Sequence, residues 1–260
     1  MTTAGATRRV PPLGGFSPTF LGLEIRRMLR NRRTMVFTLV VPPVFYLLFG
    51  GLSQANQVQA DGRGNVSAYL VISFAVYGSM LANTSAGASV AVERALGWSR
   101  QLRLTPLNPV AYFATKLITA MVESAVSVAI VFAVGALGGA AMPGRIWVVS
   151  GLVAWIAGLV FAAFGLFIGY VMPSENVMQY IGPILALLAV MGGIFVPLTD
   201  LSSTLRALAP FTPAYGAGTL ARAALLGSGV DGGAIVNVVV WTALFAAGAV
   251  WRFRRDTARV

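Results

Sequence analysis

Six long stretches of this 260-residue chain contain no charged side chain, and this feature restricts its fold more than any other. They cover residues 34–60, 64–92, 124–144, 146–174, 176–199 and 232–251. A helix that crosses a bilayer needs about 20 mostly apolar residues, and each stretch is long enough. Only 10% of the residues are charged, whereas soluble domains carry about 25%. The chain is therefore predicted to be an all-α integral membrane protein.

Six membrane spans are expected within one transmembrane unit that covers residues 34–260. The predicted spans are 34–53, 66–91, 110–137, 146–172, 176–198 and 233–251. Residues 1–16 are rich in Thr, Gly and Pro, and we expect a flexible N-terminus there. Residues 17–33 lie between these two parts and are predicted to form a helix of their own.

Basic residues are distributed unequally between the two sides that six crossings define. Fifteen Lys and Arg residues fall on the side of both termini, against four on the other side. Because positive charge marks the cytoplasmic side, both termini are predicted to be cytoplasmic, in a multi-pass protein of the cytoplasmic membrane. This distribution also explains the net charge of +11 without nucleic-acid binding.

Residues 17–33 have the pattern of an amphipathic helix. Ser17 can cap its start, and Pro18 suits the first helical position. Apolar residues fall on one face, and most of the arginines fall on the other. Either the helix lies on the cytoplasmic membrane surface, with its arginines at lipid head groups, or it is the basic flank of the first span.

Several classes of catalytic site are excluded by composition. The chain has no cysteine and no histidine, which removes disulfides, thiol catalysis, Ser-His devices and most zinc sites. Its four aspartates are scattered through loops and the C-terminal tail. No catalytic residue and no metal site is therefore predicted.

A compact polar stretch, "VERALGWSRQLRLTPLNP", lies between the second and third predicted spans. Helical spacing over residues 93–104 places Ala95, Trp98 and Leu102 on one face. Pro106 would end the helix at Thr105, because the residue before a proline disfavours helical geometry. The helix either fits a partner in the cytosol or is a basic topology anchor with a tryptophan at the membrane interface.

The segment between the fifth and sixth spans contains two short semi-apolar pieces, at about 202–209 and 214–226. Neither can cross a bilayer, and Pro210 and Pro213 break the chain between them. A helical hairpin that enters the outer leaflet or an ordinary surface loop would fit this pattern.

A few polar residues fall inside the predicted spans. Glu123 lies well inside the third span, where ionisable groups are rare and usually functional. Lys116 is two helical turns away, too far for a direct bond. Glu123 could be neutral, paired with another chain, or in contact with substrate. Asn83 and Thr84 could line a substrate path or only bond between helices.

Together these features resemble the type-2 ABC exporter permeases. The family pattern after the second span is matched by Glu93, Arg94, Gly97, Leu102, Thr105, Pro106 and Leu107. The basic helix at 17–33 resembles the family's elbow helix. "GGIFVPL", with Pro197, resembles the end of its fifth span, and "LRALAPFTPAYGAGTLARAALLG" resembles its extracellular re-entrant hairpin. Trp98 departs from the family pattern, in which a small hydroxyl residue is frequent.

The resemblance implies that residues 93–107 form a cytoplasmic coupling helix, which docks on a separate nucleotide-binding ATPase subunit. The expected contact residues are Glu93, Arg94, Gly97, Trp98, Arg100, Leu102, Thr105 and Pro106. The chain's only lysine lies in "FATKLIT", without the glycines of a P-loop. We therefore expect no cofactor on this chain, ATP and Mg²⁺ on the partner, and a second permease, identical or paralogous.

The expected function is the permease subunit of an ATP-driven exporter of a drug-, lipid- or glycan-like amphiphile. An ion-coupled secondary transporter is the alternative. It would need coupling-ion groups near the membrane centre, and the chain offers one intramembrane acid and no obvious repeat of its halves. A structural membrane anchor would leave the polar stretch at 93–107 without a purpose.

Overall fold

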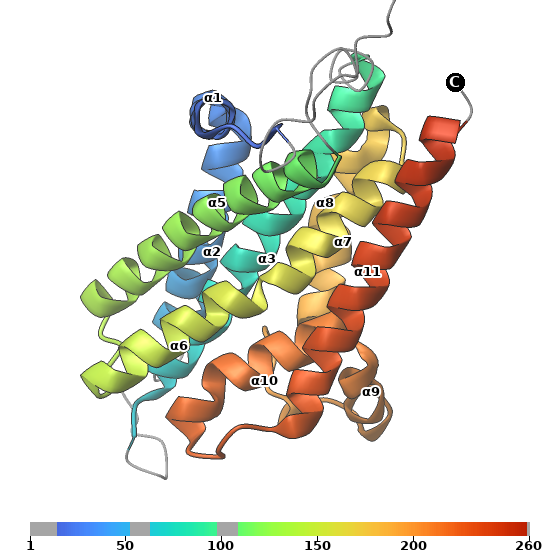
Figure 1. Ribbon diagram of the computed structural model, residues 1–260. Helices are drawn as coiled ribbons and strands as arrows, with labels where there is room; N and C mark the ends of the chain where they lie inside the picture. Colours follow the sequence, from blue (N-terminus) through green and yellow to red (C-terminus); the bar gives the residue numbers. More distant parts are fainter. Residues whose placement is uncertain (1–14, 53–62, 98–108, 259–260) are drawn as a thin grey trace, which may run out of the picture.

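A computed structural model describes residues 15–52, 63–97 and 109–258, and these residues form helices and connections without strands (Figure 1). The helices are α1 (Pro18–Arg30), α2 (Arg32–Leu52), α3 (Val66–Ala95), α5 (Pro109–Leu137), α6 (Gly144–Ala157), α7 (Leu159–Val171), α8 (Ser174–Met191), α9 (Ser203–Leu208), α10 (Pro213–Leu226) and α11 (Gly232–Ala258). Two short 3₁₀ turns, η2 (Leu198–Asp200) and η3 (Ala209–Phe211), flank α9. The predicted flexible N-terminus lies almost entirely outside the described residues.

Four helical segments are long and apolar enough to cross a membrane: α3, α5, the α6–α7 pair and α11. A fifth is added if α1 and α2, which meet at 64°, are counted as one bent span. The all-helical architecture of a multi-pass membrane protein is thus confirmed. The full set of six spans stays a prediction, because the apolar part of α8 covers only residues 179–191.

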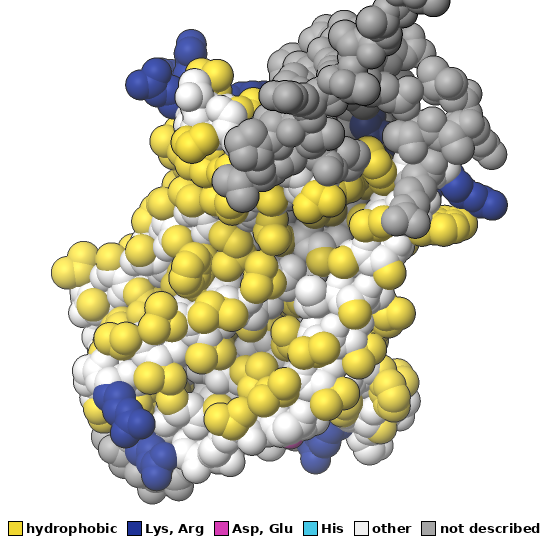
Figure 2. All heavy atoms as spheres, in the orientation of Figure 1, with side chains coloured by type: hydrophobic (Ala, Val, Ile, Leu, Met, Phe, Trp, Pro, Cys, Tyr) yellow, Lys and Arg dark blue, Asp and Glu magenta, His cyan; other side chains and the backbone are white. Residues whose placement is uncertain are grey.

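The bundle has two distinct ends (Figure 1). We call the end that holds α1 and the C-terminal end of α11 the terminal end, and the opposite one, which holds α9 and α10, the hairpin end. Between them, the view in Figure 2 shows a broad apolar surface, with Lys and Arg side chains gathered toward the two ends. This distribution is the one expected of a protein surrounded by lipid at its middle.

Two predicted boundaries are wrong, and a third span is a broken helix. The fourth span runs over Gly144–Val171, close to the predicted 146–172, but it is interrupted at Gly158, where α6 ends and α7 begins. The fifth ends at Met191 instead of residue 198, because Gly192 and Gly193 turn the chain, the latter with φ +73°. The second continues to Ala95, so that Glu93 and Arg94 belong to α3. Apolar composition indicated where these helices lie, whereas glycines with positive φ, Gly97 and Gly193, follow the ends of α3 and α8.

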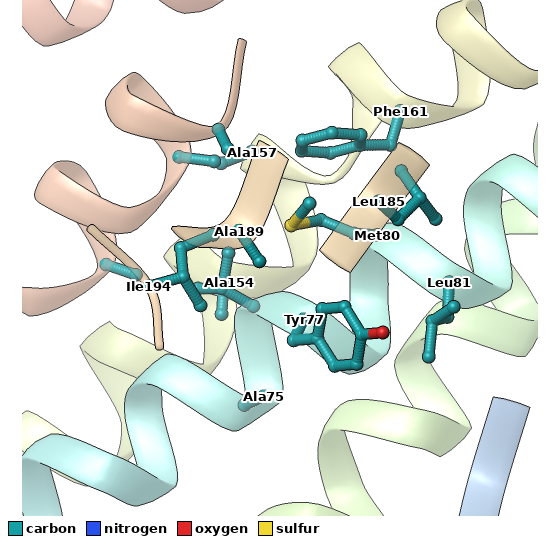
Figure 3. Packing of buried hydrophobic residues seen from close by; sticks show 14 of the residues in the cluster. Ala75, Tyr77, Met80, Leu81, Ala154, Ala157, Phe161, Leu185, Ala189 and Ile194 are labelled. Carbon is teal, nitrogen blue, oxygen red and sulfur yellow. The ribbon is translucent and has the colours of Figure 1, made fainter. Parts of the chain in front are cut away.

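The centre of the fold is α3. Its side chains are buried along most of its length, and Tyr77, Met80 and Leu81 pack with residues of the α6–α7 pair and α8 (Figure 3). Phe161 of α7 and Leu185 of α8 contribute to the same core. By contrast, α11 buries little of its length. Of the four candidate spans, α3 is the least hydrophobic and the most buried, whereas the more hydrophobic α11 is the least buried.

Small residues allow α3 and α7 to pack backbone against backbone. A Cβ atom on Gly87 would lie 2.6 Å from the backbone nitrogen of Leu166, and one on Gly165 would lie 2.4 Å from the Thr84 carbonyl oxygen. Only glycine fits at either position. This close packing agrees with the small-residue contacts expected of helices in membranes.

The segment after α8 forms the two short helices that its sequence predicted. Pro197 precedes η2, Pro210 lies in η3, and Pro213 is the first residue of α10. Asn237 of α11 holds this segment. Its Oδ1 accepts the Gly216 amide at 3.2 Å, and its Nδ2 donates to the Pro210 and Thr212 carbonyls. Entry of the hairpin into the outer leaflet stays a prediction.

Candidate functional site

Four charged side chains meet at the terminal end of the bundle, and we call Glu24, Arg27, Glu93 and Lys116 the charge cluster. Lys116 Nζ lies 2.5 Å from Glu24 Oε2 and 2.5 Å from Glu93 Oε1. Arg27 Nη1 lies 2.8 Å from Glu93 Oε1 and 3.4 Å from Glu24 Oε1. The Tyr112 hydroxyl donates to Glu93 Oε2 at 2.6 Å. The cluster therefore connects α1, α3 and α5.

Local structure brings each group to this point. Ser17 accepts the Phe20 amide and starts α1, with Pro18 at its first position, as the sequence predicted. Glu24 is then the buried residue of α1, and Arg27 follows one turn later. Glu93 lies in the last turn of α3, and Lys116 lies two turns into α5.

The cluster balances its charge internally, with two carboxylates and two cations. Glu24, Glu93 and Lys116 are all less than 10% exposed. Such groups lose their hydration when they are buried, and good geometry on every partner is needed to compensate. Each of the three has at least two close polar contacts or ion pairs, counting their contacts with Arg27 and Tyr112. The four side chains are therefore linked in one network of ion pairs.

A cavity of about 130 Å³ extends from the charge cluster into the bundle. Besides cluster residues, its lining includes Met28, Asn31, Thr34, Ser85, Ala86, Ser89, Thr119 and Glu123. The walls come from α1, the start of α2, α3 and α5. They are rich in hydroxyl and amide groups, so the cavity can hold water or a small polar group.

Glu123 lies among the residues that line this cavity and is 1% exposed. Its Oε1 accepts a hydrogen bond from Thr38 Oγ1 at 2.8 Å. Ser127 donates to the Thr38 carbonyl at 3.0 Å and fixes the same turn of α2. Lys116, the nearest cation along α5, pairs with the cluster acids instead, as the two-turn separation suggested.

Asn83 and Thr84 are buried in the helical core and are not among the residues that line the cavity. Asn83 Nδ2 donates to Ser79, which bonds Ser124 of α5 at 2.8 Å. Thr84 donates to the Phe161 carbonyl at 3.4 Å. Both residues make contacts within or between helices. Among the described residues, Asn83 Oδ1 is one of two buried side-chain atoms without a hydrogen-bond partner.

The predicted coupling helix is described only at its start, and that part differs from the expectation. Glu93 and Arg94 belong to α3, and Gly97, with φ +73°, follows the end of that helix. A continuous helix over 93–104 is therefore wrong at its start, because a left-handed residue ends α-helical geometry. Trp98, Arg100, Leu102, Thr105 and Pro106 lie outside the described residues.

Arg94 fixes the end of α3 to the end of α7. Its Nη1 donates to the Gly169 and Tyr170 carbonyls at 3.2 and 3.0 Å, and its guanidinium lies 5.1 Å from the centre of the Tyr170 ring. Arg252 of α11 donates to the same Tyr170 carbonyl at 3.4 Å. The last carbonyls of a helix have no donor within that helix, and cations are favourable there.

The roles of Glu24, Arg27 and Tyr112 were missed at the sequence level. One indication was present, since Glu24 is the only acid in the arginine-rich segment 17–33. An acid on such a helix needs a cation partner if it faces protein. One partner, Lys116, lies 92 residues away on α5, and the other, Arg27, lies 3 residues away on α1. Sequence spacing therefore could not identify these residues as one cluster. No group of three or more potential metal-binding acids occurs in the described ranges.

These features define a helical membrane protein with a polar site at one end of its bundle, connected to the helix that precedes the 98–108 segment. The sequence pattern of the ABC-2 type transporter family matches residues 19–226, and the chain belongs to this family. A Bacillus subtilis (strain 168) protein named "Putative transport permease YvfS" is 28% identical over 225 residues, which cover 85% of this chain and 90% of that protein. The family places the chain as a membrane component of an ABC transporter.

Proposed function

We propose that this chain is the permease subunit of an ATP-driven exporter of amphiphilic molecules. The observation that carries the proposal is the charge cluster. It joins α1 to the end of α3, which precedes the 98–108 segment, and to α5, which follows it. A motor that pulls on this segment would move three helices together. Membership of the ABC-2 type transporter family supports the same assignment.

In this proposal, a separate ATPase subunit binds residues 93–107 on the cytoplasmic side. Glu93 is buried within the cluster, so it positions the docking segment from inside the permease. Arg94 has the same role toward α7. Both termini are cytoplasmic, α1 is the elbow helix at the membrane surface, and a second permease, identical or paralogous, completes the transport path. ATP and Mg²⁺ bind on the partner.

Co-purification is the first test of the proposal. The chain would be expressed with the ATPase subunit encoded beside it and reconstituted in lipid. We expect a stable complex with vanadate-sensitive ATPase activity. An ATPase that neither associates with the permease nor changes its turnover in the permease's presence would contradict the assignment. Transport by the permease alone, driven by an ion gradient, would favour a secondary transporter.

A matched pair of variants tests the positioning role of Glu93. Glu93→Gln and Glu24→Gln each remove one carboxylate from Lys116, but only Glu93 lies at the end of α3. Glu93→Gln is expected to lower permease-dependent ATPase turnover several-fold more than Glu24→Gln at equal membrane insertion. Equal losses in the two variants would show that the cluster affects stability alone. An Arg94→Ala variant should resemble Glu93→Gln.

A further inference from the structure

We infer that the cavity between α1, α2, α3 and α5 binds an organic cation through Glu123, and that the charged group of an exported amphiphile is an alkylammonium. The assignment of this cation as cargo rests on the proposed transport function. Binding of the cation rests only on the cavity and its charges.

The cavity lining contains three acidic and two basic side chains. Of the charged groups that line the cavity, Glu24 and Glu93 are neutralised by Lys116 and Arg27 at the cytoplasmic mouth. This leaves the carboxylate of Glu123. A buried carboxylate requires a cation, strong donors or a proton, and a bound ammonium satisfies this requirement.

Glu123 accepts a side-chain hydrogen bond at one of its two carboxylate oxygens. Thr38 donates to Oε1, while no donor from the described residues bonds Oε2. Ionised carboxylates accept at both oxygens, so one oxygen remains for a ligand. The residue lines the cavity despite being 1% exposed. Thr38 therefore holds the carboxylate in place and leaves its second oxygen for a cation in the cavity.

The depth of the cavity suits an amphiphile that enters from the cytoplasmic leaflet. Ser85 lies eight residues before Glu93 on α3, and Glu123 lies seven residues after Lys116 on α5. At 1.5 Å per residue, both are about 10–12 Å deeper than the charge cluster. Ser85 lines the cavity at this depth, and Ser89 and Thr119 line it between this level and the charge cluster. A volume of about 130 Å³ accommodates an ammonium group with a few methylenes or waters.

The absence of cysteine from the chain provides a direct test. Ser85→Cys introduces a single thiol in the cavity, and Arg26→Cys, at an exposed position that is not in the cavity lining, serves as the control. The purified permease in nanodiscs would be treated with methanethiosulfonates that carry a trimethylammonium or a sulfonate group. We expect the cationic reagent to react at least about tenfold faster at Ser85→Cys, after normalisation to the control.

Glu123→Gln in the Ser85→Cys background is expected to reduce this preference several-fold, since the amide keeps the size of the side chain and removes its charge. Decyltrimethylammonium should slow the cationic reaction at Ser85→Cys and leave the control unchanged, whereas decyl maltoside should have no effect. The protection experiment retains Glu123, so the inference stays testable if Glu123→Gln fails to fold.

Three results would overturn the inference: equal rates for the two reagents, a preference that survives Glu123→Gln, or no protection by the alkylammonium. Ser89→Cys, nearer the mouth, is a second reporter, and an absence of reaction at both positions would also contradict an accessible cation site. None of these measurements needs the ATPase subunit. Failure of the cation site is therefore distinguishable from failure of the proposed ATP-driven transport.

Discussion

Lys116 of α5 bonds Glu93, in the last turn of α3, at 2.5 Å, and the same ammonium bonds Glu24 of α1 at 2.5 Å. One buried cation thus connects the basic N-terminal helix to the helix end that precedes the 98–108 segment. The chain's only lysine is also the residue on which this connection depends.

Lys116→Met is expected to lower the free energy of unfolding by about 3–5 kcal/mol, because two buried carboxylates lose the ammonium that they share. SDS titration of the purified protein measures this change. Arg26→Met, at an exposed position on α1, should change stability by less than about 0.5 kcal/mol. A triple variant that also carries Glu24→Gln and Glu93→Gln should be more stable than Lys116→Met. A single variant as stable as its Arg26 control would refute this account of the cluster.

Gly87→Ala is expected to destabilise the protein by about 1–3 kcal/mol, because its new methyl group would meet the backbone of α7. Gly165→Ala should destabilise the protein to a similar extent, because its methyl group would meet the backbone of α3. Gly22→Ala is the control, since nothing lies within 4 Å of its added methyl group, and it should stabilise α1 slightly. Thermal unfolding in detergent distinguishes them, and three equal melting temperatures would argue against backbone contact between α3 and α7.

Asn237→Leu is expected to loosen the start of α10, where Thr212 makes no side-chain capping bond and Asn237 accepts the Gly216 amide instead. The loss of its hydrogen bonds should cost about 1–3 kcal/mol. Hydrogen exchange of the Gly216 amide should accelerate. Thr242→Val removes a bond within α11 only and is the control. Unchanged protection of Gly216 in Asn237→Leu would contradict this role.

Arg94→Gln is expected to lower the free energy of unfolding by about 2 kcal/mol, because the charged donors to the Gly169 and Tyr170 carbonyls are lost. Arg30→Gln, at an exposed position on α1, should have little effect on stability. Both variants can be compared by SDS titration at equal protein concentration. If both unfold at the same SDS fraction, Arg94 does not hold the ends of α3 and α7 together.

Much of the architecture could be predicted because a bilayer imposes length and composition on every helix that crosses it. Charge-free runs located α3, α5, the α6–α7 pair and α11, and the Ser17-Pro18 pair located the start of α1. The two short helices before α11 followed from Pro210 and Pro213. Helix ends were harder, since Gly158 and Gly193 interrupt runs that remain apolar throughout.

Only some residues of the candidate site could be predicted from the sequence. Glu123 was recognisable because an acid in a span is costly wherever it lies. Its partner Thr38, which lies 85 residues away, could not be recognised, because a threonine in an apolar run gives no indication of a bond to another helix. Glu93 belonged to the predicted docking segment, but its burial against Lys116 depends on how α3 and α5 align.

By itself, the sequence determined the membrane as the environment, the approximate helices and the family, because these depend on local composition and on the order of motifs. Only the tertiary structure decided which charges neutralise one another and which carboxylate remains. Pairing depends on distances of a few ångströms between residues that lie 23 to 92 positions apart in the chain. Local sequence preferences do not specify such distances, because the packing of whole helices sets them.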